Sequence, residues 1–215
     1  MELGTREKLL LLKIQANKRN YYSSFKVLER TLLLFEVLEM FRDKEFVLEQ
    51  KRITAGKFIS ENARKKIFFE MVKNATRKRK LYSWVERFYR KKNQYVEKSL
   101  QILEREKIIK IEKAKILNLF PSKKIELLKP NVKIQLVNSL ENIIVNGKVS
   151  DKETILLLRE LDNKFYYQVA FEAKDWRERS KLRKQNRKML KKITMEPYEK
   201  VVNDLSLHLS YNGFA

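Results

Sequence analysis

The sequence contains no cysteine, one histidine, four glycines and three prolines among its 215 residues. Without cysteine, the chain has no disulfide framework, no thiolate metal site and no cysteine nucleophile. The single histidine, His208, excludes a multi-histidine metal site and most histidine-based catalysis. So few glycines and prolines argue against a glycine-rich phosphate loop and against an all-β fold with many turns.

Long hydrophobic runs are also missing. The longest apolar stretch, Leu32–Phe41, has ten residues and includes Glu36 and Glu39, whereas a membrane-spanning helix needs about 20 apolar residues. The leucine run Leu9–Leu12 is too short for a signal-peptide core, and no small-residue cleavage site follows it. We therefore expect a cytoplasmic protein that spans no membrane, and the lack of cysteine fits a reducing compartment.

Positive charge is the most prominent property that the sequence does have. The chain carries 49 Lys and Arg against 27 Asp and Glu, a formal net charge of +22. Segment Lys73–Lys92 holds nine basic residues and one acid, and segment Lys174–Lys192 holds ten and two, so each carries a net +8. Charge of this size implies a polyanionic partner, namely nucleic acid, an anionic membrane surface or an acidic protein.

Hydrophobic periodicity predicts a mostly α fold. Hydrophobic residues make up 43% of the chain, enough to build a core. Apolar spacings of three, four and seven residues predict helices over residues 5–15, 23–42, 58–73, 82–107, 131–145, 151–161, 166–192 and 198–208. Alternating apolar residues predict two short β-hairpins, at 46–53 and 108–120. We expect a single helical domain over residues 1–215 whose part from 165 to 215 is helical and basic, with a basic C-terminal helix that can project from it.

Local signals set the expected boundaries. Thr5 is a candidate N-cap of the first helix, and Asn146-Gly147 is a candidate C-cap. Residues 17–20 are expected to be a polar break and residues 77–80 a loop. Pro121 and Pro130 are expected to bracket a polar connection. In the second helix, the predicted apolar stripe leaves the two glutamates, Glu36 and Glu39, off its face.

No catalytic pattern is present. The sequence has no GxSxG, no HExxH and no Walker loop, and its aspartates form no DxD or DxN metal pattern. His208 has no visible catalytic partner and is expected to be structural. We therefore expect a non-enzymatic protein without a metal site or cofactor.

Basic residues are interleaved with aromatic ones in two places. One cluster contains Tyr21 and Arg30, and the other runs from Tyr82 to Lys92. Guanidinium and ammonium groups bind phosphate, and aromatic rings suit base stacking or a membrane interface. Trp84 and Phe88 lie four residues apart, so they can equally be core residues on one helix face.

Several stretches occur in an order that resembles a known family. They are LGTREKLLLL, ERTLLLFEVLEMFRDKEFVLEQ, ITAGKFISENARKKI, YSWVERF, ILEREKI and ILNLFPSKKIEL, all within residues 3–128. In this order they resemble the Golgi phosphoprotein 3 family. The resemblance implies a mostly α fold with short hairpins and, in eukaryotic members, a basic pocket for phosphatidylinositol 4-phosphate.

The resemblance also implies site residues. The family's early Trp falls on Tyr21, the Arg of its second helix on Arg30, and its two long-helix Arg on Lys92 and Tyr95. A tyrosine cannot pair with phosphate as an arginine does, so Arg90 and Lys91 are candidates to replace it. The expected head-group site is therefore made of Tyr21, Arg30, Arg90, Lys91 and Lys92. An apolar loop at Leu119 and Phe120, followed by two lysines, is the expected membrane-insertion element, although Phe120 can equally pack under the hairpin.

The functional expectation is a peripheral membrane protein that binds anionic, phosphoinositide-like phospholipid head groups. Arg30→Ala is then expected to weaken binding more than Lys184→Ala. The first alternative is a nucleic-acid-binding protein with a winged-helix-like helix–hairpin element, in which Lys174–Lys192 follows phosphates. The second is an adaptor for the acidic tails of membrane-protein clients. An oligomer is compatible with each of these.

Overall fold

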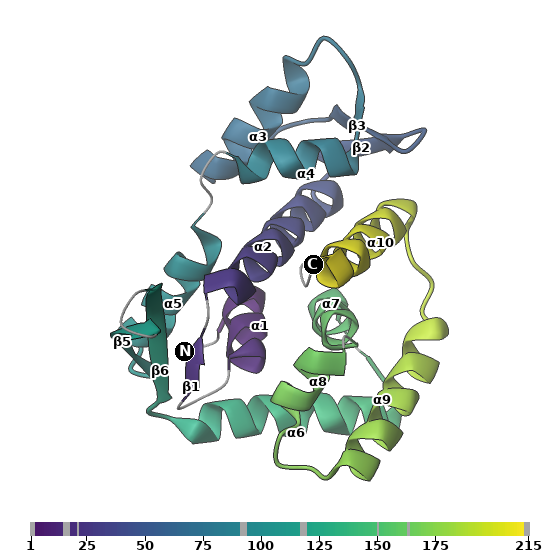
Figure 1. Ribbon diagram of the computed structural model, residues 1–215. Coiled ribbons are helices and arrows are strands. Elements are labelled where there is room, and N and C mark those ends of the chain that lie inside the picture. Colours follow the sequence, from purple (N-terminus) through teal and green to yellow (C-terminus); the bar gives the residue numbers. More distant parts are fainter. Residues whose placement is uncertain are drawn as a thin grey trace. The chain divides into compact units, whose positions relative to one another are not determined.

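The computed structural model describes residues 3–14, 18–20, 22–90, 94–116, 120–149, 151–162 and 164–212. Most of this described chain is helical, which confirms the predicted mostly α class (Figure 1). The helices are α1 (Thr5–Lys13), α2 (Tyr22–Arg42), α3 (Ala63–Lys73), α4 (Leu81–Tyr89), α5 (Tyr95–Arg105), α6 (Pro130–Asn146), α7 (Lys152–Leu161), α8 (Lys164–Ala170), α9 (Trp176–Lys191) and α10 (Pro197–Asn212). The strands are β1 (Lys18–Asn20), β2 (Phe46–Glu49), β3 (Arg52–Ala55), β4 (Arg79–Lys80), β5 (Ile109–Ile116) and β6 (Phe120–Leu127).

The chain forms two compact units. The first unit contains Met1–Phe25 and Val96–Thr194, and the second contains Lys26–Tyr95 and Met195–Ala215. Each unit therefore combines segments that are far apart in the sequence. The chain passes from one unit to the other three times. The expectation of one domain over residues 1–215 stays a prediction.

The second half of helix α1, from Leu9 to Lys13, is buried in the first unit. The side chains of Leu9–Leu12 are at most 1% exposed, and α6, α7 and α8 pack against this helix. Four consecutive leucines place apolar side chains on every side of this half of the helix, so it belongs in the core. The expected N-cap role of Thr5 is wrong: Gly4 is the N-cap residue, and the Thr5 hydroxyl donates to Glu153 Oε2 at 2.5 Å instead.

The sheet of the first unit has three antiparallel strands in the order β1-β6-β5. The expected hairpin at 108–120 is thus correct in place but too short. The polar connection expected between the two prolines is mostly strand β6, in which Ile125 is fully buried between exposed or half-buried lysine and glutamate neighbours. The expected polar break at 17–20 includes β1, which pairs with Lys123–Ile125 of β6.

The hairpin expected at 46–53 in the second unit is confirmed. Strands β2 and β3 pair in antiparallel register, with Phe46 and Ile53 buried. The two residues between the strands, Gln50 and Lys51, have φ values of 47° and 63°, as a tight two-residue hairpin turn requires. The expected loop at 77–80 is partly wrong, because Arg79–Lys80 forms β4 and pairs with β3.

Stacked aromatic rings fill the core of the second unit. The Phe88 ring centre lies 4.2 Å from that of Phe68, 5.6 Å from that of Trp84 and 6.1 Å from that of Phe46. All four side chains are at most 2% exposed. The core alternative for Trp84 and Phe88 is therefore correct, and the amphipathic pattern of α4 marks its packing face.

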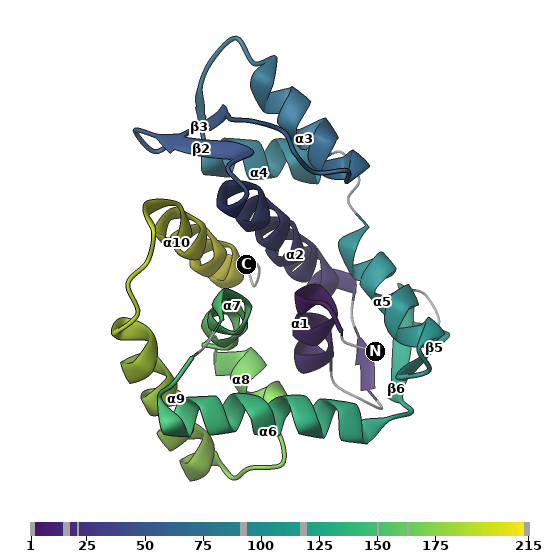
Figure 2. The same ribbon diagram turned by 180° about the vertical axis from the view of Figure 1, so that it is seen from behind.

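Two of the expected long helices are each split in two. The helix expected over 82–107 consists of α4 and α5, because the backbone N–H of Tyr95 donates to the side chain of Glu29 at 2.9 Å. The helix expected over 166–192 consists of α8 and α9, because Asp175 starts a new helix with a capping box. The expected projection of this basic helix is also wrong, since α9 packs on α6, α7 and α8 (Figures 1 and 2).

Other helix boundaries follow their caps. Helix α3 begins five residues later than expected, because the side chain of Asn62 accepts hydrogen bonds from the backbone N–H groups of Arg64 and Lys65. Helix α6 ends as predicted, with Gly147 at φ 66° in the left-handed region. Helix α10 covers the expected 198–208 and extends to Asn212.

A tight loop joins β3 to α3 and is held by two backbone hydrogen bonds and one buried carboxylate. One of these bonds runs from the N–H of Lys57 to the Lys44 carbonyl, at 3.3 Å. The N–H of Gly56 donates to the Glu45 carbonyl at 2.8 Å, and the Glu45 carboxylate accepts the N–H groups of Ile59 and Ser60 at 3.2 and 2.7 Å. Glu45 is fully buried. A Cβ atom on Gly56 would overlap the carbonyl oxygen of Lys44, so only glycine fits here.

We predict that Gly56→Ala lowers the free energy of unfolding by about 2–3 kcal/mol, because the backbone of Lys44 must move to admit the methyl group. Gly147→Ala is the matched control: its Cβ meets open space, and only its positive φ opposes the change, at about 1 kcal/mol. Urea unfolding of both variants measures the difference. Equal losses would contradict the close approach at Gly56.

Candidate anion-binding surfaces

Arg30, the expected centre of the head-group site, already has partners. It lies on α2 in the second unit, with its Nε 3.2 Å from Glu86 Oε1 and its Cζ 4.2 Å from the centre of the Tyr89 ring. Both ion-pair side chains are about a quarter exposed, at 26% and 25%. An anionic ligand at Arg30 would therefore have to compete with a carboxylate and a stacked ring.

The other expected pocket residues are placed only in part. Arg90 is exposed and is the C-cap of α4, directly after Tyr89, so Arg30 does lie against the helix end that carries it. Tyr21, Lys91 and Lys92 lie outside the described residues. Tyr95, which takes the position of the family's second long-helix arginine, is 2% exposed and belongs to the core.

The side chains of the expected insertion element lie outside the described part of the chain. Leu119 lies outside the described residues, and Phe120 is the first residue of β6, with its side chain outside the described part. The two lysines that follow Phe120 form ion pairs with acidic side chains. Lys123 pairs with Glu97, and Lys124 Nζ lies 3.6 Å from Glu112 Oε2.

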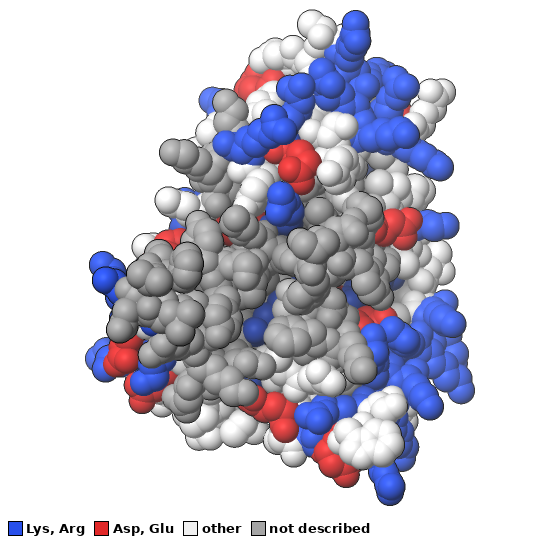
Figure 3. Space-filling view, in the orientation of Figure 1, with Lys and Arg blue, Asp and Glu red and all other residues white. Residues whose placement is uncertain are grey.

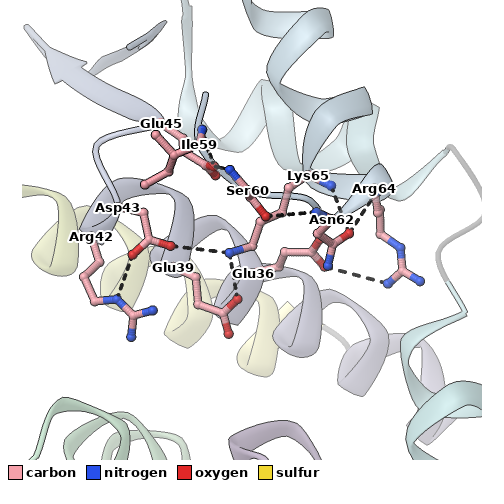
Figure 4. Close-up of polar contacts among 10 residues, drawn as sticks. All are labelled: Glu36, Glu39, Arg42, Asp43, Glu45, Ile59, Ser60, Asn62, Arg64 and Lys65. Atoms are coloured by element: carbon pink, nitrogen blue, oxygen red, sulfur yellow. Dashed lines mark hydrogen bonds and ion pairs between the residues drawn. The ribbon is translucent and has the colours of Figure 1, made fainter. Parts of the chain in front are cut away.

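Acidic side chains of α2 and of Asp43, the residue after it, neutralise the basic start of α3 (Figure 4). Lys65 Nζ lies 3.2 Å from Glu39 Oε2 and 3.6 Å from Asp43 Oδ2. Arg64 Nη1 lies 3.7 Å from Glu36 Oε2. These two α3 cations point inward and are not available to a ligand.

Glu36 does not lie off the buried face, as expected, but is fully buried. Its partners come from outside its own helix, which the periodicity of α2 alone could not show. The Arg64 guanidinium carbon lies 4.3 Å from the Tyr95 ring centre, so Arg64 connects the buried acid with this ring. Burial, reinforced by the charge of Glu36, raises the pKa of Tyr95 far above its usual value near 10.

Helix α9 in the first unit contains most of the second basic segment, and its inner face is packed. Leu182, Asn186 and Met189 are buried, and the Asn186 amide donates to the Leu158 carbonyl at 3.1 Å. On the flank, Arg187 Nε lies 2.7 Å from Asp162 Oδ1. These contacts fix the rotation of α9 about its axis and therefore decide which residues face outward.

The outward residues of α9 form a row of cations that we call the α9 stripe. It consists of Arg177, Lys181, Lys184, Lys188 and Lys191, at alternating spacings of four and three residues. All five are exposed, and none forms an ion pair with an acid in the described part of the chain. At a rise of 1.5 Å per residue, the stripe is about 21 Å long. Figure 3 shows Lys and Arg side chains gathered over α9, at the lower right.

A second basic surface lies on the sheet of the second unit. Arg52 and Lys80 are exposed and stand directly opposite each other on β3 and β4. Lys78 beside them pairs with Glu49 at 2.6 Å. Figure 3 shows blue side chains over β2 and β3 at the top of the view. Lys51 and Arg77 are also exposed there, but they lie in a turn and before a strand and not along one helix face as the α9 stripe does.

Comparison with known proteins adds no family. No protein-family model matches the chain, and no curated protein matches it. The resemblance to the Golgi phosphoprotein 3 family therefore stays a prediction. Among the residues that the structure describes, no helix is both long and apolar enough to cross a membrane, and no three His, Asp or Glu side chains lie together as a metal site.

We predict that Glu36→Ala lowers the free energy of unfolding by about 3–5 kcal/mol. The substitution removes a buried carboxylate and leaves Arg64 without its acidic partner. Glu39 lies on the same helix, but its side chain is 33% exposed. Glu39→Ala should therefore lower the free energy of unfolding by at most about 1 kcal/mol. Chemical denaturation of both variants tests this. Similar losses of unfolding free energy in the two variants would show that the buried Glu36 carboxylate does not stabilise the fold.

Proposed function

We propose that this protein binds the anionic surface of a membrane peripherally, without catalysis, and that α9 is its docking helix. The observation that carries the proposal is the α9 stripe, five exposed cations on one face of a packed helix with no acidic partner in the described chain. The net charge of +22 and the family resemblance support the same reading.

The expected strength fits reversible docking. Each Lys or Arg near an anionic leaflet contributes about 1 kcal/mol, so five contribute about 5 kcal/mol. Because α9 is packed against three other helices, its cations are held in line before they meet the membrane. The attraction falls with ionic strength, since exposed charges are screened within about 8 Å at physiological salt.

The same contacts change the expected order of two variants. The Arg30 guanidinium is held by Glu86 and Tyr89, whereas Lys184 lies in the middle of the stripe. We therefore propose that Lys184→Ala weakens membrane binding about fivefold and that Arg30→Ala weakens it less, the reverse of the order expected from the sequence.

Nucleic acid is the alternative that the stripe also permits, because a row of cations can follow a phosphate backbone. Lys and Arg bind phosphate oxygens in any nucleic acid, whatever its base sequence.

We predict that the triple variant Lys181→Glu, Lys184→Glu, Lys188→Glu binds vesicles of phosphatidylglycerol and phosphatidylcholine at least about a hundredfold more weakly than the unchanged protein. Co-sedimentation measures the affinity. The unchanged protein should bind these vesicles in a salt-dependent way and should not bind phosphatidylcholine alone.

The matched control replaces three exposed lysines of the second unit with glutamate, in the triple variant Lys57→Glu, Lys66→Glu, Lys73→Glu. It changes the net charge by the same amount. It should keep most of the binding. Equal loss in both triple variants would show that net charge, not the stripe, is responsible. Equal binding to neutral vesicles would remove the proposal, and tighter binding to a DNA duplex at physiological salt would favour the alternative.

A further inference from the structure

Trp176 is the most exposed large hydrophobic residue in the described chain. It is the first residue of α9, and 67% of its surface is accessible to solvent. The other tryptophan, Trp84, is 2% exposed and stacks on Phe88. No pattern in the sequence predicted a role for Trp176.

The backbone around Trp176 is held in place. Asp175 accepts hydrogen bonds from the N–H groups of Arg177 and Glu178 at 2.7 and 2.8 Å, and the Glu178 carboxylate accepts the Asp175 N–H at 3.1 Å. This capping box fixes the first turn of α9. Both carboxylates of that turn lie at the helix N-terminus, whose partial positive charge offsets part of their negative charge.

The indole lies at the end of the α9 stripe and has a cation beside it. The Arg177 guanidinium carbon is 5.5 Å from the centre of the Trp176 ring, and Arg177 is the first residue of the stripe. A tryptophan ring is apolar with one N–H donor, and such rings prefer the boundary between head groups and acyl chains. Lysines and arginines suit the phosphate layer just outside that boundary.

We propose that Trp176 is an interfacial anchor, which enters the head-group region of an anionic bilayer while the α9 stripe rests on the phosphates. This inference rests on the proposed function and deepens it, because it names the apolar contact that accompanies the electrostatic one. It places α9 parallel to the membrane surface, with its packed face away from the lipid.

Tryptophan emission tests the anchor directly, because the chain has two tryptophans and one is buried. Addition of phosphatidylglycerol-containing vesicles should shift the emission to shorter wavelength and protect it from iodide quenching. The change should be absent in Trp176→Ala and absent with phosphatidylcholine vesicles. Lipids brominated near the head of the acyl chain should quench the emission of the unchanged protein.

Affinity gives a second readout. Trp176→Ala should bind the anionic vesicles about tenfold more weakly or worse, from the loss of one buried aromatic ring. Tyr82→Ala, which removes an exposed aromatic ring from the second unit, is the control and should bind normally. Circular dichroism of each variant checks that the fold is retained.

The outcomes separate the two proposals. Sedimentation with anionic vesicles but unchanged emission, or unchanged affinity of Trp176→Ala, would overturn the anchor and leave the stripe in place. Absence of sedimentation would overturn both. A blue shift with single-stranded DNA but not with vesicles would also overturn the anchor, because the ring would then be a stacking surface for bases.

Discussion

Ion pairing within each unit decides which of the many cations remain available to a ligand. Lys13, Lys65 and Lys133 are all buried, and each lies within 3.2 Å of a carboxylate oxygen. Burial lowers the pKa of Lys13, and its partner Glu160 acts in the opposite direction and favours the charge. With 27 acids for 49 cations, the acids that serve such inward cations cannot also neutralise the outer face of α9.

Periodicity alone was sufficient where one element carries its own signal. The hairpin at Phe46–Ala55 and the pair α6 and α7 with Gly147 between them were predicted from alternation, helical spacing and one glycine. Elements that depend on a distant partner were missed. Strand β1 consists of three polar residues and shows no alternation. Helix α5 begins where the backbone N–H of Tyr95 donates to the distant Glu29 side chain, and no local pattern predicts that hydrogen bond.

The candidate site shows the same division. The sequence indicated that the second basic segment was unusual, but one long helix from 166 to 192 gave it no orientation. The Asp175-x-x-Glu178 capping box was readable and would have placed the helix start. Leu182 and Met189 would then have marked the inner face and, by exclusion, the stripe. The Glu86 partner of Arg30, by contrast, comes from a helix far along the chain and could be found only in the structure.

The division of the chain between two units bears on synthesis. In the second unit, the Phe41 ring stacks 5.4 Å from the Tyr198 ring of α10, although most of the first unit lies between them in the sequence. A growing polypeptide therefore cannot complete that unit until its final helix has left the ribosome. Contacts between such distant residues close large loops and slow folding. Until then the Phe41 ring of α2 lacks the aromatic ring that stacks on it in the folded unit.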